Sequence, residues 1–194
     1  MANKIKYGIK NCYYAVATLA SDNSATYGTP VALPGAVSIS LEPQGDNTTF
    51  YADNIAYWVG NGNNGYSGTL ELARIPDSFK RDVLGMIKDT KNILVENMNS
   101  AIVHFALLFQ FEGDVKATKH VMYNCTATRA ADAGTTKGES IEPQTETINI
   151  EAKSIYVSGL SADIVKAEAG ENSDSTTYNG WTSTVYLPTA AATT

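Results

Sequence analysis

Apolar and polar residues alternate along much of the chain. In the clearest run, one face holds Val103, Phe105, Leu107, Phe109 and Phe111, and the other holds His104, Ala106, Leu108, Gln110 and Glu112. A period of two turns large apolar groups to one side of a β-strand and milder groups to the other. Similar alternation over residues 37–42, 120–127 and 147–151 predicts half-buried strands and a mainly β fold.

One segment has a helical period instead. Pro76 and Asp77 suit a first helical turn, where a missing N–H and a negative charge are both tolerated. Four apolar residues then recur at helical spacing, namely Phe79, Val83, Met86 and Ile87. This pattern predicts one α-helix over residues 77–90, with its apolar stripe against the sheet.

The length of 194 residues fits a single domain spanning residues 1–194, with extended arms allowed. Three polar stretches without periodicity, residues 21–35, 135–144 and 168–180, are expected to be irregular loops. The N-terminus lacks the apolar stretch of a signal peptide, and no segment could span a bilayer. We therefore expect assembly in a cytoplasm and no membrane partner.

The net charge of the chain argues against some classes of function. Fourteen Lys and Arg against twenty Asp and Glu give a net charge of −6. A nucleic-acid reader needs a basic footprint that neutralises phosphates, and none is visible, so specific DNA or RNA binding is not expected. Cys12 and Cys125 cannot build a disulfide scaffold or a four-ligand zinc site, and they are expected to be reduced, partly buried thiols.

Residues 60–65 read Gly-Asn-Gly-Asn-Asn-Gly, the glycine spacing of a dinucleotide-binding turn. That turn must lead into a helix that holds the pyrophosphate, whereas residues 66–72 read as a strand. Asn and Gly also supply the positive φ angles of a hairpin turn, which is the preferred interpretation.

Catalytic arrangements are equally weak. His104 and His120 have no neighbouring nucleophile or carboxylate pattern that nominates a triad or a metal site. Asp46 and Asp53 lack the spacing of a calcium loop. We predict no catalytic, metal-binding or cofactor-binding residues, no cofactor, and a protein that is not an enzyme.

Residues 50–59 are rich in aromatic residues and contain one acid and no base. Tyr and Trp carry much of the binding energy at protein interfaces, so Tyr51, Tyr57 and Trp58 are contact candidates. An ordinary core strand is an equally good interpretation of this segment.

Three further stretches carry a family resemblance. They are Tyr51–Asn54 after Glu42-Pro43, Phe111–Asp114 leading into His120–Ala127, and Glu142–Thr147. Through their order and spacing, residues 5–160 resemble the major tail proteins of long-tailed, non-contractile-type bacteriophages, which are tail tube subunits. The chain departs most from that family after Ser161, so residues 161–194 are treated as a C-terminal segment or arm.

The resemblance implies a β-sandwich or rolled sheet with one flanking helix, a long hairpin at residues 43–65 and terminal arms that reach neighbouring subunits. It implies a virion protein that forms stacked, hexameric rings around transiting DNA. Its partners would be other copies of itself, a tape-measure protein, a tail terminator and distal tail proteins. The implied subunit contacts are Tyr51, Asp53, Asn54, Tyr57 and Trp58.

An acidic lumen would repel phosphates and let DNA slide. Four acids on polar strand positions are therefore predicted to face the lumen, namely Glu71, Glu112, Glu146 and Glu151. The alternative function is a carbohydrate- or cell-surface-binding β-module that uses Tyr57 and Trp58 as a sugar platform. That alternative predicts a discrete small oligomer that binds a glycan, whereas a tube subunit polymerises.

Overall fold

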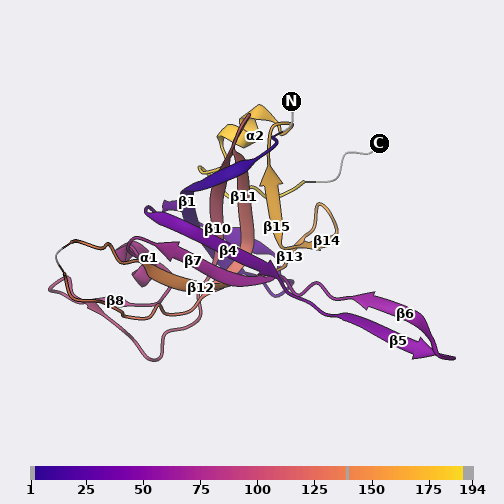
Figure 1. The fold of residues 1–194 in the computed structure, drawn as a ribbon, viewed down its shortest axis with the longest axis horizontal. Coiled ribbons are helices and arrows are strands. Elements are labelled where there is room, and N and C mark those ends of the chain that lie inside the picture. Colours follow the sequence, from indigo (N-terminus) through magenta and orange to yellow (C-terminus); the bar gives the residue numbers. More distant parts are fainter. Residues whose placement is uncertain (1–2, 139, 190–194) are drawn as a thin grey trace.

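The computed structural model describes residues 3–138 and 140–189. Its main element is a nine-stranded antiparallel sheet in the order β2-β1-β10-β11-β12-β7-β4, with β3 beside β1 and β15 beside β11 (Figure 1). The strands are β1 (Lys6–Leu19), β2 (Ala25–Tyr27), β3 (Val31–Ala32), β4 (Ala36–Pro43), β7 (Tyr66–Leu72), β10 (His104–Gly113), β11 (Thr118–Ala127), β12 (Glu146–Lys153) and β15 (Lys166–Ala169). The sheet rolls up without closing into a barrel, which confirms the predicted mainly β, rolled-sheet fold.

Smaller elements surround this sheet. Three two-stranded sheets are β5 (Asn47–Ala52) with β6 (Ile55–Asn61), β8 (Ile87–Lys88) with β9 (Leu94–Val95), and β13 (Ile155–Val157) with β14 (Ala162–Ile164). The two described helices are α1 (Asp77–Asp82) and α2 (Ser175–Asn179). The two loops expected at residues 21–35 and 168–180 therefore contain short elements, because β2 and β3 pair with β1 and because α2 lies within the second loop.

The predicted helix over residues 77–90 is too long. α1 ends at Asp82, and Ile87 already belongs to β8. Gly85 has a φ of 71°, a left-handed conformation that stops a helix. The apolar residues Phe79 and Val83 do face the sheet as expected, where both are buried.

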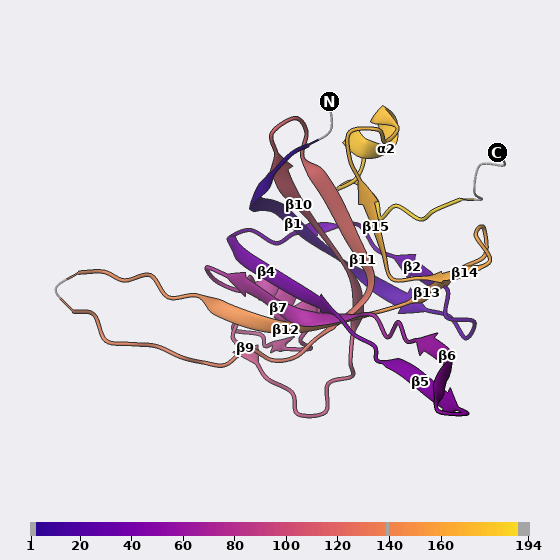
Figure 2. The same cartoon turned by 45° about the vertical axis from the view of Figure 1, so that its right-hand side comes forward.

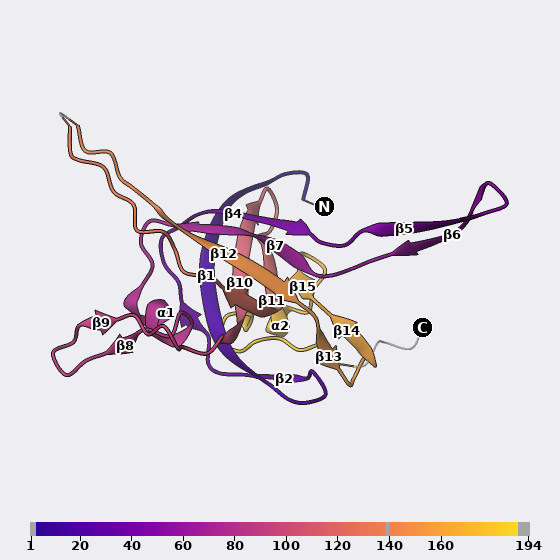
Figure 3. The ribbon, with the colours of Figure 1, turned by 90° about the horizontal axis from the view of Figure 1, so that it is seen from below.

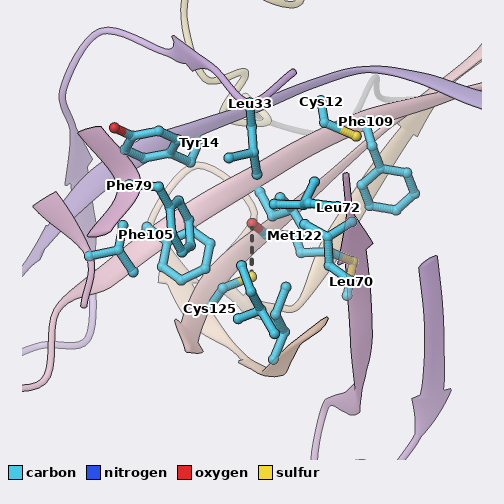
Figure 4. Packing of buried hydrophobic residues seen from close by; sticks show 14 of the residues in the cluster. Cys12, Tyr14, Leu33, Leu70, Leu72, Phe79, Phe105, Phe109, Met122 and Cys125 are labelled. Carbon is cyan, nitrogen blue, oxygen red and sulfur yellow. Dashed lines mark hydrogen bonds between the residues drawn. The ribbon is translucent and has the colours of Figure 1, made fainter. Parts of the chain in front are cut away.

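The central strands β10 and β11 are covered on both faces, so the expectation of half-buried strands is wrong here. Phe105 and Leu107 belong to one buried cluster, which also contains Phe79 of α1 (Figure 4). Ala106 and Leu108, on the opposite face of β10, belong to a second cluster that is completed by residues after 154. The physical reason is that the C-terminal segment covers the face that the pattern assigned to milder groups.

A β-bulge also interrupts the expected alternation in β11. Phe105 pairs with Cys125, whereas Leu107 pairs with Met122, so three residues of β11 match two of β10. A bulge of this kind turns the following side chain to the other face. Cys125 consequently packs in the first cluster with Met122, instead of sharing a face with Val121 and Tyr123.

The C-terminal segment packs on the sheet of its own chain as far along as Tyr186. Asp174 caps α2, since its Oδ2 accepts a hydrogen bond from the Thr177 N–H at 2.8 Å. Trp181 is 3% exposed, and its Nε1 donates to the carbonyl of His120 at 3.3 Å. The last five residues of the predicted C-terminal segment, 190–194, lie outside the described part of the chain.

Candidate functional site

A two-stranded hairpin projects from the sheet (Figures 1, 2 and 3). It consists of β5 and β6, and together with its flanking residues 44–46 and 62–65 it is called the arm. Backbone hydrogen bonds between Gln44 and both Asn64 and Gly65 close its base, at 2.8 Å each. The arm therefore leaves the body between β4 and β7, in the segment 43–65 where a long hairpin was expected.

The arm exposes large apolar side chains on both strands. Their exposed fractions are 58% for Phe50, 67% for Tyr51, 60% for Ile55, 69% for Tyr57, 57% for Trp58 and 55% for Val59. An isolated two-stranded hairpin is marginally stable in water, and contiguous exposed apolar surface marks an interaction site. These exposed fractions contradict the interpretation as a core strand, and the contact role of the segment stays a prediction.

Asp53 and Asn54 form the turn at the tip of the arm. Their φ angles are 50° and 62°, as a two-residue type I′ turn requires, and Ala52 pairs with Ile55 across it. The glycine-rich residues 60–65 were predicted to make a hairpin turn, and that prediction is wrong. They lie at the base of the arm, where Gly65 has a φ of 92° and a Cβ atom would collide with the carbonyl oxygen of Ala152. The strand β7 follows directly, without the helix of a dinucleotide site.

Trp58 is held against the arm itself. It pairs with Phe50, while Tyr51 pairs with Ala56, so Tyr57 is the extra residue of a bulge. A Cβ atom at Gly60 would collide with the Trp58 ring, which shows that the indole lies across this glycine. The five predicted contact residues therefore all lie in the distal part of the arm, with Asp53 and Asn54 at its tip.

A polar surface covers the outer side of β4, β7 and β12. These strands turn Ile39, Leu41, Leu70, Leu72, Ile148 and Ile150 toward the first buried cluster. The alternate positions are Ser38, Ser40, Glu42, Ser67, Thr69, Glu71, Thr147, Asn149, Glu151 and Lys153, and these ten residues are called the polar face. The pairing Ser38–Glu71–Thr147 places one residue of each strand side by side. No apolar side chain belongs to this set, so the face is suited to water.

Glu71 is ionised at the centre of a hydrogen-bond network on this face. Its carboxylate accepts from the hydroxyl of Thr145 at 2.6 Å and from that of Ser38 at 2.7 Å. The bond from Thr145, followed by that from Ser38, lowers the pKa of Glu71 below its ordinary value. The network fixes a negative charge on the polar face at neutral pH.

The structure brings together two of the four acids predicted to face a lumen. Glu71 and Glu151 lie on the polar face, and Glu42 joins them. Glu146 lies on the opposite side of β12, where its carboxylate accepts a hydrogen bond from the Ile75 N–H at 2.6 Å. Glu112 lies on β10 and forms an ion pair with Lys10 of β1. Glu42 was missed, although its alternation with Leu41 already indicated the polar side.

The histidines and cysteines lie apart from both surfaces. His104 hydrogen-bonds Asn124 at 2.7 Å, and His120 stacks on Phe109 with ring centroids 5.1 Å apart. Cys12 and Cys125 are free and buried, as predicted, and burial raises the pKa of each thiol to about 12. Within residues 3–138 and 140–189 no three His, Cys, Asp or Glu side chains gather in a way that could hold a metal ion.

Neither described helix has the length and apolar character needed to cross a membrane. A family model described as "Phage tail tube protein" matches residues 2–181 of the chain. No curated protein matches the chain.

Proposed function

The chain belongs to the phage tail tube protein family and is a structural component of a virion tail, and from this premise we propose that its copies form stacked hexameric rings around transiting DNA. Under this proposal the protein acts by self-assembly and performs no catalysis. Assembly takes place in the cytoplasm of the host. The tape-measure protein, the tail terminator and the distal tail proteins are its other partners.

The exposed aromatic arm is the observation that carries the proposal. Tyr51, Tyr57 and Trp58 are each more than half exposed, on a hairpin that residues 3–138 and 140–189 leave largely uncovered. Covering them with another copy removes that apolar surface from water. Asp53 and Asn54 are at the tip, where they would contact the neighbouring copy first.

The polar face is proposed to line the lumen. Its Ser, Thr and Asn side chains need no apolar cover in a wet channel. Glu42, Glu71 and Glu151 outnumber Lys153 and give the face a net negative charge. DNA phosphates are repelled by such a wall, so DNA moves without binding to it. A basic wall would instead release counterions from the DNA and retain it. Glu112 and Glu146 are not part of this proposed lining.

Electron microscopy of the purified protein over rising concentration tests the proposal. The expected result is hollow tubes built from stacked rings, with the polar face inward in a reconstruction. A variant lacking residues 46–64 should remain folded, because the pairing of β4 with β7 up to Pro43 and Tyr66 lies outside the deletion. This variant should polymerise poorly. A chain that stays a discrete small oligomer at all concentrations and binds a glycan saturably would establish the carbohydrate-binding alternative instead.

The double variant Glu71→Lys and Glu151→Lys separately tests the proposal that the polar face lines the lumen. Tubes of this variant should retain DNA in a filter-binding assay at low salt and release it at high salt, while wild-type tubes retain none. The matched control is Glu112→Lys and Glu146→Lys, which reverses two acids outside the polar face. If the control retains DNA and the polar-face variant does not, the polar face does not line the channel.

A further inference from the structure

A pocket lies between β4, the edge strand of the rolled sheet, and the strands β10, β11 and β15. Its volume is about 320 Å³, at the lower end of the range of pockets that bind small molecules. Ten residues line it, namely Lys6, Ile39, Ser40, Leu41, Tyr66, Phe109, Phe111, His120, Met122 and Lys166. This cavity is called the seam pocket, and none of its lining residues belongs to the arm.

The lining of the seam pocket is mainly apolar and aromatic. Phe109 and Met122 belong to the first buried cluster. Four other lining residues pack against that cluster while they remain partly exposed, namely Ile39, Leu41, Tyr66 and Phe111. The rings of Phe109 and Phe111 meet edge to face, with their centroids 5.5 Å apart. The apolar lining therefore continues into the core, which holds it in place before any ligand arrives.

Two lysine ammonium groups lie over this aromatic lining. Lys6 Nζ lies 4.6 Å from the centroid of the Phe111 ring, and Lys166 Nζ lies 4.9 Å from the centroid of the Tyr66 ring. Among the side chains of residues 3–138 and 140–189, no carboxylate forms an ion pair with either lysine. The rings hold both cations by cation–π attraction and leave their N–H groups available to an anion.

His120 and Glu168 complete the polar part of the pocket. His120 Nδ1 lies 3.7 Å from an oxygen of the Glu168 carboxylate. Burial lowers the pKa of His120, Glu168 raises it, and the ammonium groups of Lys166 and Lys6 lower it again, so the imidazole is neutral at pH 7. Two ammonium groups against one carboxylate leave an excess of one positive charge at the pocket, in a chain whose net charge is −6.

We propose that the seam pocket binds a small amphipathic carboxylate, with its apolar body against the aromatic lining and its carboxylate on Lys6 and Lys166. Hydrogen bonds between an ammonium group and a carboxylate are stronger than those between neutral groups. Contact with the lining removes the apolar body from water. A neutral molecule of the same shape keeps the apolar contact and lacks the ion pairs. The site belongs to the single chain, so the inference does not depend on self-assembly.

Equilibrium dialysis with naphthylacetate tests the site, and naphthylacetamide is the matched neutral probe. The test variant is Lys6→Gln with Lys166→Gln, and because both side chains are exposed its fold should be intact. The control variant is Lys88→Gln with Lys91→Gln, which removes the same charge at two exposed positions outside the seam pocket. A third variant lacks residues 46–64, because the exposed aromatic side chains of the arm could also hold a naphthyl group.

The wild-type protein should bind one naphthylacetate per chain and bind naphthylacetamide more weakly. In the Lys6→Gln, Lys166→Gln variant the affinity for naphthylacetate should fall about tenfold, because two exposed ion pairs each contribute modestly. The affinity for naphthylacetamide should not change, and the control variant and the arm deletion should bind both probes like the wild type. Equal binding of the two probes by the wild type, or unchanged binding of naphthylacetate by the Lys6→Gln, Lys166→Gln variant, would overturn the inference. Loss of binding on deletion of the arm would also overturn it, since the ligand then lies on the arm.

Discussion

Replacing the two most distal aromatic residues of β6 should weaken polymerisation strongly. In the double variant Tyr57→Ser and Trp58→Ser, the side chains become small and polar, while the turn at Asp53 and Asn54 is unchanged. Both aromatic residues are exposed in the single chain, so the isolated subunit should keep its fold and stability. The change therefore acts on the contact between copies.

The expected loss of free energy at the contact between copies follows from the exposed fractions of the two side chains. These fractions are 69% for Tyr57 and 57% for Trp58. A fully buried aromatic side chain removes roughly 150–250 Å² from water, so covering the exposed parts of both would bury about 280 Å². At ~25 cal/mol per Å² this contributes about 7 kcal/mol as an upper bound. Ordering of side chains and desolvation offset part of it, and we expect a net loss of roughly 3 kcal/mol per contact. That loss raises the critical concentration on the order of 100-fold.

Sedimentation of polymer over a concentration series measures the critical concentration directly. Val115→Ser is the matched control, because Val115 is 52% exposed and lies outside the arm and the polar face. Circular dichroism of the monomers checks that both variants are folded. A critical concentration within twofold of the wild-type value for the Tyr57→Ser, Trp58→Ser protein would refute the argument that the arm carries the contact.

Further predictions concern the subunit itself. Phe79→Ala should lower the free energy of unfolding in urea by about 3–5 kcal/mol, because the ring is fully buried, and Phe79→Leu should lose clearly less. Cys12 and Cys125, whose pKa values burial raises to about 12, should resist alkylation at pH 8 until urea is added; rapid labelling of the folded protein would contradict this. Burial is the largest cause that lowers the pKa of His120 below its ordinary 6.5. As the pH falls below 6.5, His120 therefore binds a proton more readily in the unfolded chain than in the folded chain. Stability should decrease there, and an equal decrease in His120→Gln would exclude His120 as the source.

The periodicity of the sequence correctly predicted features that depend only on residues close together in the chain. The alternation along β4, β7 and β12 separated the polar side from the apolar side, because Ser38, Glu71 and Thr147 each follow the period of two. The aromatic content of residues 50–59 left a contact strand and a core strand open, and the exposure of these side chains contradicts the core strand. The helical period found α1 but not its end, which a left-handed Gly85 decides.

The sequence by itself indicated strands near residues 37–42, 66–72, 103–112, 120–127 and 147–151 and the kind of residue on their faces, whereas the arm was expected only from the family resemblance. Only the tertiary structure decided which faces are covered. Ala106 and Leu108 are buried by a segment some fifty residues further along, and the bulge that turns Cys125 depends on the register between β10 and β11. The pairing of β7 with β12 likewise places Glu71 and Glu151 on one face. Glu146 lies on the opposite face because it shares the period of Ile148 and Ile150, which the sequence alone already records. A period records which side chains share a side, but what lies against that side is set by contacts between residues distant in the chain.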